Sequence, residues 1–81
     1  MKVRIKFFAA PREALGRAEM EKELPAGATV RDLVEQLAKE HPALCRYVPS
    51  MNLAVNRQYV DLDSTLRDGD EVACVPPVAG G

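Results

Sequence analysis

The sequence has little of several residue types on which functional sites are often built. It contains no tryptophan, one histidine and two cysteines, and only 5% of its residues are aromatic. Cys45 and Cys74 are too few for a disulfide scaffold, and with a single histidine they do not make the ligand set of a structural zinc site. We therefore expect both thiols to be reduced and no metal to be bound.

An excess of one charge and long apolar runs are also missing. Eleven basic and 12 acidic residues give a formal net charge of -1, which leaves no basic surplus for nucleic acid or a membrane surface. No apolar run approaches the roughly 18 residues of a membrane span, and the opening MKVRIKFFAA lacks the apolar core of a signal peptide. We expect a cytoplasmic protein with neither a nucleic-acid nor a membrane partner.

What remains is the composition of an ordinary globular domain. The chain has 81 residues, of which 47% are hydrophobic and 28% charged. A chain of this length is expected to form a single domain, residues 1–81, with a small core and little room for an enclosed active site. It is not expected to catalyse a reaction alone.

Two segments within the first 24 residues alternate as half-buried strands do. Val3, Ile5 and Phe7 share one face of a strand whose other face is basic, and Phe8 breaks this pattern by joining the basic face. Residues 18–24, AEMEKEL, alternate in the same way. Pro11 and residues 12–17 between them are interpreted as a loop, so the two strands are expected to pair as a hairpin.

Residues 29–41 predict an amphipathic helix. Thr29 is a helix cap, Asp32 lies three residues on as the acid of a capping box, and Pro42 ends the helix near His41. The apolar positions recur at helical spacing and form one stripe, which consists of Val30, Leu33, Val34, Leu37 and Ala38.

The second half of the chain predicts short strands. Residues 52–56 form one strand, Arg57 and Gln58 its turn, and residues 59–60 its return; a further turn at residues 68–70 leads into the strand 71–75. In that last strand Val72 and Cys74 share one face and Ala73 and Val75 the other. The order of elements predicts an α+β domain with one main helix packed on one face of a mixed sheet.

Five segments carry a family resemblance: FFA at 7–9, GATVRDL at 27–33, AVN at 54–56, LRDGDEVA at 66–73 and PPVAGG at 76–81. They resemble the ubiquitin-like sulfur carriers of the β-grasp fold, and most of all the small subunit of molybdopterin synthase. The resemblance implies a β-grasp domain with a projecting diglycine tail, residues 75–81. It also implies that the carboxylate of Gly81, with Gly80 beside it, is adenylated and then converted to a thiocarboxylate.

The same resemblance implies the partners. An E1-like enzyme activates Gly81 with ATP, and the large synthase subunit receives the sulfur and transfers it to cyclic pyranopterin monophosphate, so that two carriers supply the two sulfurs of the dithiolene. A heterotetramer of two small and two large subunits is implied as well. The carrier itself is expected to bind no cofactor; its sequence has no GxxxxGK[ST] phosphate loop.

Exposed apolar residues predict where such partners dock. Phe8 and Val75 lie on the faces of their strands opposite the core, and in a β-grasp sheet the first and last strands are parallel neighbours. We expect Phe8 and Val75 to lie close together, with Tyr59 near them. The tail completes the predicted contact, through Pro76 and Pro77, which stiffen its base, and through Val78 and Ala79.

Other interpretations remain open. Cys74 could be a sulfur-bearing nucleophile, but its inward direction favours packing, and Cys45 is interpreted as a packing residue too. His41 is interpreted as a favourable cation at a helix end. A carrier for thiazole or cysteine synthesis would differ only in the acceptor, and a ubiquitin-like protein modifier or binding module would leave Gly81 in an isopeptide bond or unmodified. A stand-alone enzyme is the least favoured function.

Overall fold

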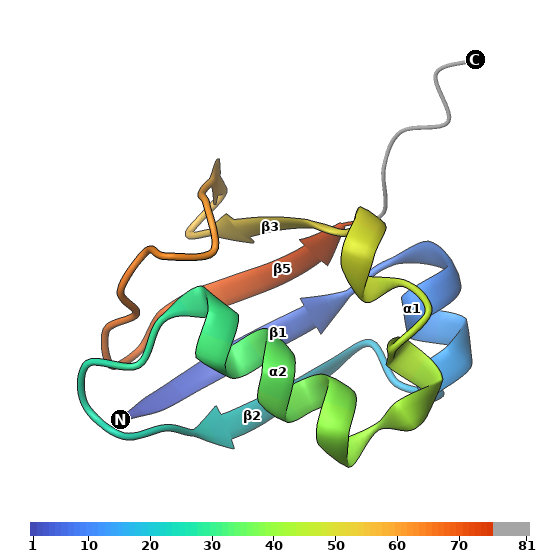
Figure 1. Cartoon of the computed structure of the whole chain (residues 1–81), viewed down its shortest axis with the longest axis horizontal. Coiled ribbons are helices and arrows are strands. Elements are labelled where there is room, and N and C mark those ends of the chain that lie inside the picture. The colour runs from blue at the N-terminus through green and yellow to red at the C-terminus, as the bar shows by residue number, and fades with distance from the viewer. Residues whose placement is uncertain (76–81) are drawn as a thin grey trace.

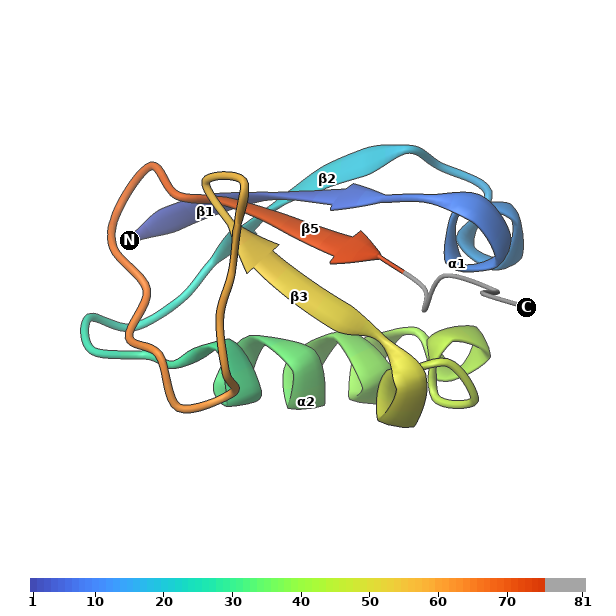
Figure 2. The same cartoon turned by 90° about the horizontal axis from the view of Figure 1, so that it is seen from above.

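The computed structural model describes residues 1–75, in which one sheet lies over one main helix (Figures 1 and 2). The five strands lie in the order β2-β1-β5-β3-β4. Strands β1 and β5 are parallel, and the other neighbouring strands are antiparallel. The strands are β1 Lys2–Phe7, β2 Glu19–Glu23, β3 Asn52–Val55, β4 Gln58–Tyr59 and β5 Glu71–Val75. The predicted hairpin and the β-grasp arrangement are confirmed.

The main helix, α2, covers Val30–Glu40 and begins at the predicted cap. The Asp32 backbone N–H donates to the Thr29 hydroxyl at 3.2 Å, and the Thr29 N–H donates to the Asp32 carboxylate at 2.9 Å. These two bonds form a capping box, which satisfies backbone donors that the first turn leaves free. The helix ends at Glu40, before His41 and Pro42, as the sequence predicts.

The core lies between α2 and the sheet. Ile5 of β1, Leu33 of α2 and Val72 of β5 are fully buried, and Figure 2 shows α2 packed along one face of the sheet. The predicted stripe of α2 is confirmed at four of its positions, Val30, Leu33, Val34 and Leu37, which are all buried. The alternating apolar side chains of the strands point to one face of the sheet, and α2 covers that face.

The loop predicted around Pro11 and Gly16 is wrong, because this segment contains the helix α1, Ala9–Leu15. Pro11 is tolerated because it lies in the first turn, where the helix needs no N–H donor. Gly16 has a φ of 79° and caps the C-terminus. Ala9 has a φ of 53°, so the chain turns from β1 into α1 at a single residue. Figure 1 shows α1 at the end of the sheet.

The turn predicted at Arg57 and Gln58 lies one residue earlier. Asn56 and Arg57 have φ values of 50° and 71°, which are the positive values that a two-residue hairpin turn requires. The return strand is Gln58–Tyr59. The turn predicted before the last strand is confirmed at Gly69, which has a φ of 87°. Two short 3-10 helices, η1 Pro42–Leu44 and η2 Val48–Ser50, connect α2 to β3.

Candidate functional site

The face of the sheet away from α2, here called the outer face, carries the candidate docking residues. In β5, Val72 and Cys74 are buried against α2, whereas Ala73 and Val75 are half-buried on the outer face. Within residues 1–75 no helix lies over this face (Figure 2). The sequence-predicted division of β5 into two faces is confirmed, and its outer residues are open to a partner.

Phe8 directly follows β1 and Val75 ends the neighbouring β5, so both lie at one end of the outer face. Phe7 of β1 is opposite Cys74 of β5 in the parallel register, and both are buried. Phe8 comes one residue later and has extended backbone angles, so its side chain points to the outer face beside Val75. It is 44% exposed. The predicted proximity of Phe8 and Val75 agrees with the register.

Tyr59 joins this surface from the edge of the sheet. It is opposite Ala54 of β3, and Ala54 in turn is opposite Ala73 of β5. Tyr59 is 69% exposed and lies two strands from Ala73, about 10 Å at the usual strand spacing. It therefore shares the outer face with Val75 but is separated from β5 by Ala54. We call these residues, Phe8, Ala54, Tyr59, Ala73 and Val75, the apolar patch.

Sequence reasoning missed Ala54 as part of the patch and placed Ala73 on this face without naming it as a contact residue. Ala54 is only 8% exposed, and its small side chain lies in the row that connects Ala73 to Tyr59. The pairing of β3 with β5 was the only signal that could have found it. The patch therefore has two small residues, Ala54 and Ala73, between its larger ones.

Charged residues continue the outer face toward the other end of β1. Lys6 is opposite Ala73 in the register and pairs with Glu71 at 3.5 Å. Lys2 pairs with Glu21 at 3.8 Å. These ions are partly exposed, so each pair stabilises the fold by about 1 kcal/mol at most. The outer face thus has the apolar patch near the end of β5, bordered by Asn52 and Lys6, and a charged half near the start of β1.

The end of β5 leads into the predicted functional tail. β5 is the middle strand of the sheet, and its last residue, Val75, belongs to the apolar patch. The chain therefore enters the tail at the patch. The remaining predicted site residues lie outside the residues that the structure describes, namely Pro76, Pro77, Val78, Ala79, Gly80 and Gly81.

The two cysteines differ in environment. Cys74 is fully buried against the core, and this burial raises the pKa of its thiol to about 12, so the nucleophilic thiolate is scarce at neutral pH. The packing interpretation of Cys74 is confirmed. For Cys45 it is wrong, because this residue is exposed and its Sγ lies 3.3 Å from the backbone oxygen of Ala38. It follows Leu44, which takes the buried position in η1.

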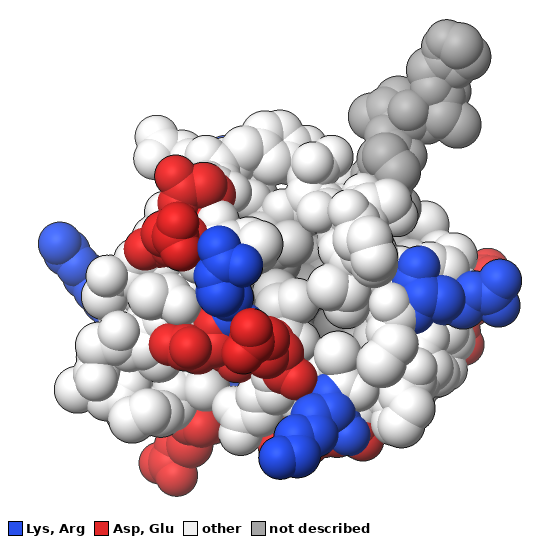
Figure 3. Space-filling model, viewed as in Figure 1, with Lys and Arg blue, Asp and Glu red and all other residues white. Residues whose placement is uncertain are grey.

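The rest of residues 1–75 gives no sign of a metal site or a membrane span. No three histidine, cysteine or acidic side chains there come together in a way that could hold a metal ion. No helix among these residues is long and apolar enough to cross a bilayer. On the face that carries α2, basic and acidic side chains are interspersed (Figure 3), so neither sign dominates there.

Comparisons with known families, sequences and structures give results that agree with one another. The model of the ThiS family matches residues 5–81. The molybdopterin synthase sulfur carrier subunit of Chlamydomonas reinhardtii is 40% identical over 83 residues, covering all of both chains. A Pyrococcus furiosus structure described as molybdopterin converting factor, subunit 1, has a TM-score of 0.88 and 43% identity, covering 96% of this chain and 99% of that one. Small archaeal modifier protein 3 of Haloferax volcanii is 35% identical over the whole of both chains.

Proposed function

Because this chain belongs to the ThiS family, we propose that it is the sulfur carrier subunit of a molybdopterin synthase. The observation that carries the proposal is the full-length match to a carrier of that name. The match covers the whole chain, from before the FFA run at 7–9 to the terminal diglycine. In the proposal the working group is the carboxylate of Gly81, with Gly80 beside it, and the folded domain presents that group to other proteins.

The chemistry of a terminal carboxylate explains why activation is needed. Its pKa in model peptides is roughly 3.5, so at neutral pH it is an anion and a poor electrophile. Attack of one carboxylate oxygen on the α-phosphorus of ATP gives an acyl-adenylate and releases pyrophosphate. A sulfur nucleophile at the oxidation level of hydrosulfide then displaces AMP from the acyl carbon, and the product is a thiocarboxylate. We assign both steps to an E1-like partner enzyme.

In the next step the sulfur leaves the carrier. The thiocarboxylate sulfur forms a C–S bond to cyclic pyranopterin monophosphate in the large synthase subunit and displaces an oxygen substituent from the attacked carbon. Water then cleaves the acyl–sulfur bond, which leaves the sulfur on the pterin and regenerates the carboxylate of Gly81. Each carrier delivers one sulfur, so a dithiolene requires two deliveries. A heterotetramer of two small and two large subunits would place a carrier at each active site. We propose that this assembly works in the cytoplasm.

The sheet supports the proposed division between domain and tail. Val75 ends β5 within the apolar patch, so a partner that covers the patch lies where residues 76–81 begin. Glycine residues have no Cβ and can pass through a channel too narrow for other residues. Pro76 and Pro77 restrict the start of the tail and lower the entropy lost on binding. Docking through the patch and delivery through the tail are therefore coupled.

A protein-modifier function is the alternative with a specific observation in its favour, the 35% identity to a small archaeal modifier protein. Both functions begin with an adenylate at Gly81 and diverge afterwards. A modifier forms an isopeptide bond with a lysine, whereas a carrier forms a thiocarboxylate. Carriers for thiazole or cysteine synthesis share the thiocarboxylate and differ in the acceptor.

Intact-mass spectrometry tests the proposal. The chain is incubated with its E1-like enzyme, ATP and a sulfide source, and its mass is expected to increase by the difference between sulfur and oxygen. A variant that lacks Gly81 serves as the control and should keep its mass. An unchanged mass of the full chain, under conditions that convert a known carrier, would contradict the proposal. Attachment to other proteins without the sulfur product would favour the modifier.

A further inference from the structure

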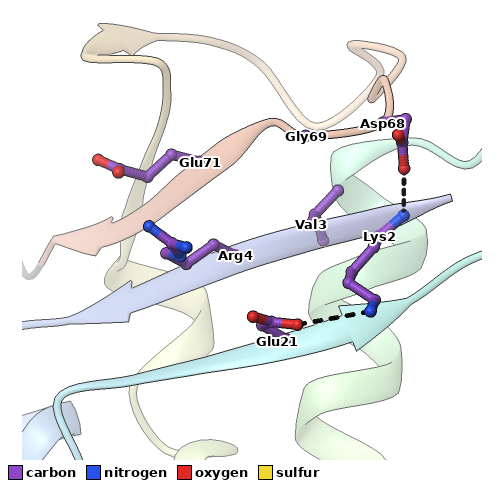
Figure 4. A pocket seen from close by; sticks show the side chains of 7 residues that line it. All are labelled: Lys2, Val3, Arg4, Glu21, Asp68, Gly69 and Glu71. Atoms are coloured by element: carbon purple, nitrogen blue, oxygen red, sulfur yellow. Dashed lines mark hydrogen bonds and ion pairs between the residues drawn. The ribbon is translucent and has the colours of Figure 1, made fainter.

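The charged half of the outer face contains a hollow, and Arg4 is one of the residues that line it. Its volume is about 310 Å³, and it lies between β2, β1 and β5 (Figure 4). Arg4 lies in β1, between β2 and β5, and is opposite Glu21 on one side and Glu71 on the other. Its side chain is exposed. A cation with an acid on each side would be expected to form an ion pair with one of them.

Neither acid pairs with Arg4, and each pairs with a different lysine instead. Glu21 pairs with Lys2 at 3.8 Å, and Glu71 pairs with Lys6 at 3.5 Å. Figure 4 shows the Arg4 side chain between the two acids, with no interaction drawn to either. Within residues 1–75 the Arg4 guanidinium forms no ion pair and no side-chain hydrogen bond.

The third acid at the hollow is also occupied. The Asp68 carboxylate accepts a hydrogen bond from the backbone N–H of Lys2 at 2.7 Å, a contact that joins the turn before β5 to the start of β1. The acids of the hollow therefore have partners within the fold, and Arg4 is left as the cation of the hollow without one. A guanidinium presents five donors in a plane that suits a carboxylate.

We propose that Arg4 receives an aspartate or glutamate side chain of the large synthase subunit and so helps to select that partner. This inference rests on the proposed function, and it extends the docking surface beyond the apolar patch. Arg4 precedes Lys6 by two residues in β1, about 7 Å along the strand, and Lys6 is opposite Ala73 of the patch. A partner that covers the patch needs only a short extension to reach Arg4.

The pairing of the flanking acids gives this contact its selectivity. Lys2 and Lys6 are each engaged by an acid of the fold. Among residues 1–75, a partner carboxylate therefore finds an unpaired cation in this part of the outer face only at Arg4. Charges at the rim of an interface influence partner choice and the rate of association more than the total affinity. Arg4 is thus a specificity residue, while the apolar patch provides most of the buried area.

Binding to the chain's own large subunit at low and moderate salt tests the proposal. Arg4→Gln is expected to weaken binding about fivefold at low salt, the upper range for an exposed ion pair. It should also reduce the salt dependence of binding, since one interfacial ion pair is lost. The matched control is Arg31→Gln, because Arg31 lies on α2 and pairs with Asp63 at 3.2 Å. The control should bind as the unmodified chain does.

Charge reversal distinguishes a direct contact from an indirect effect. Arg4→Glu should weaken binding further than Arg4→Gln, and one Asp→Lys or Glu→Lys substitution in the large subunit should restore it. Equal binding by the Arg4 and Arg31 variants at both salt concentrations would overturn the inference, as would failure of every reversed partner acid to restore binding. If Phe8→Ala weakens binding and Arg4→Gln does not, the proposed function stands and this inference is refuted.

Discussion

Truncation of Phe8 should separate docking from folding. An aromatic side chain buries about 200 Å² when fully covered, so a Phe8 that is 44% exposed leaves roughly 90 Å² for a partner to cover. At about 25 cal/mol per Å², that area corresponds to about 2 kcal/mol, or roughly a 40-fold change in dissociation constant. Phe8→Ala should therefore weaken binding to the large subunit by about this factor.

The matched control is Leu62→Ala. Leu62 is 38% exposed, nearly as much as Phe8, but it lines a groove on the α2 side of the sheet together with Val34 and Val60. Isothermal titration calorimetry with the large subunit gives both dissociation constants, and thermal unfolding confirms that both variants fold. Binding of Phe8→Ala within twofold of the unmodified chain would refute the docking role of the patch. An equal loss of affinity in Leu62→Ala would refute the location of the docking surface on the outer face.

Three further predictions concern the folded domain. Hydrogen bonding to Lys22 lowers the pKa of Glu40. The pair therefore stabilises the fold above the unfolded pKa of 4.5, and this contribution is lost as the pH falls through the lower folded pKa. Across this range, urea unfolding should show that the free energy of unfolding falls less with decreasing pH in Lys22→Gln than in the unmodified chain. A thiol reagent should label the exposed Cys45 rapidly and the buried Cys74 only on unfolding, and mass spectrometry showing equal labelling in the native protein would contradict the assigned burial. Leu33→Ala should lower the free energy of unfolding by about 2–5 kcal/mol, because Leu33 is fully buried beneath the sheet, and a loss below 1 kcal/mol in a urea titration would be inconsistent with that position.

Elements with a clear periodicity could be predicted from the sequence. The alternation in residues 2–8 and 71–75 gave the faces of β1 and β5, and the apolar stripe with its Thr29 cap gave α2. These patterns work because one face of each element is buried and the other is not. The position of Phe8 on the outer face followed from the same alternation.

Elements set by special backbone angles could not be predicted in this way. The helix α1 was missed because Pro11 and Gly16 are usually loop residues, and neither the positive φ of Ala9 nor the tolerance of the first turn for proline appears in a hydrophobic pattern. The hairpin turn was displaced by one residue because Asn56 and Arg57 both adopt positive φ values.

Parts of the site depend on pairings between distant strands. Ala54 belongs to the patch only because β3 pairs with β5. Arg4 has no ion-pair partner because its neighbouring acids pair with lysines. Neither the strand register nor these side-chain conformations can be predicted from the pattern of a single sequence. The exposure of Cys45 was missed for a similar reason, since Leu44 beside it takes the buried position in η1.

The central claim is that the carboxyl group of Gly81 delivers sulfur to the molybdopterin precursor. The most direct measurement supplies purified thiocarboxylated chain as the only sulfur source to its large subunit and cyclic pyranopterin monophosphate, and follows both the dithiolene and the mass of the carrier. We expect dithiolene to form as two carriers return to the carboxylate for each product, and none to form with a chain that lacks Gly81. A thiocarboxylate that persists without product, where a known carrier turns over, would contradict the account.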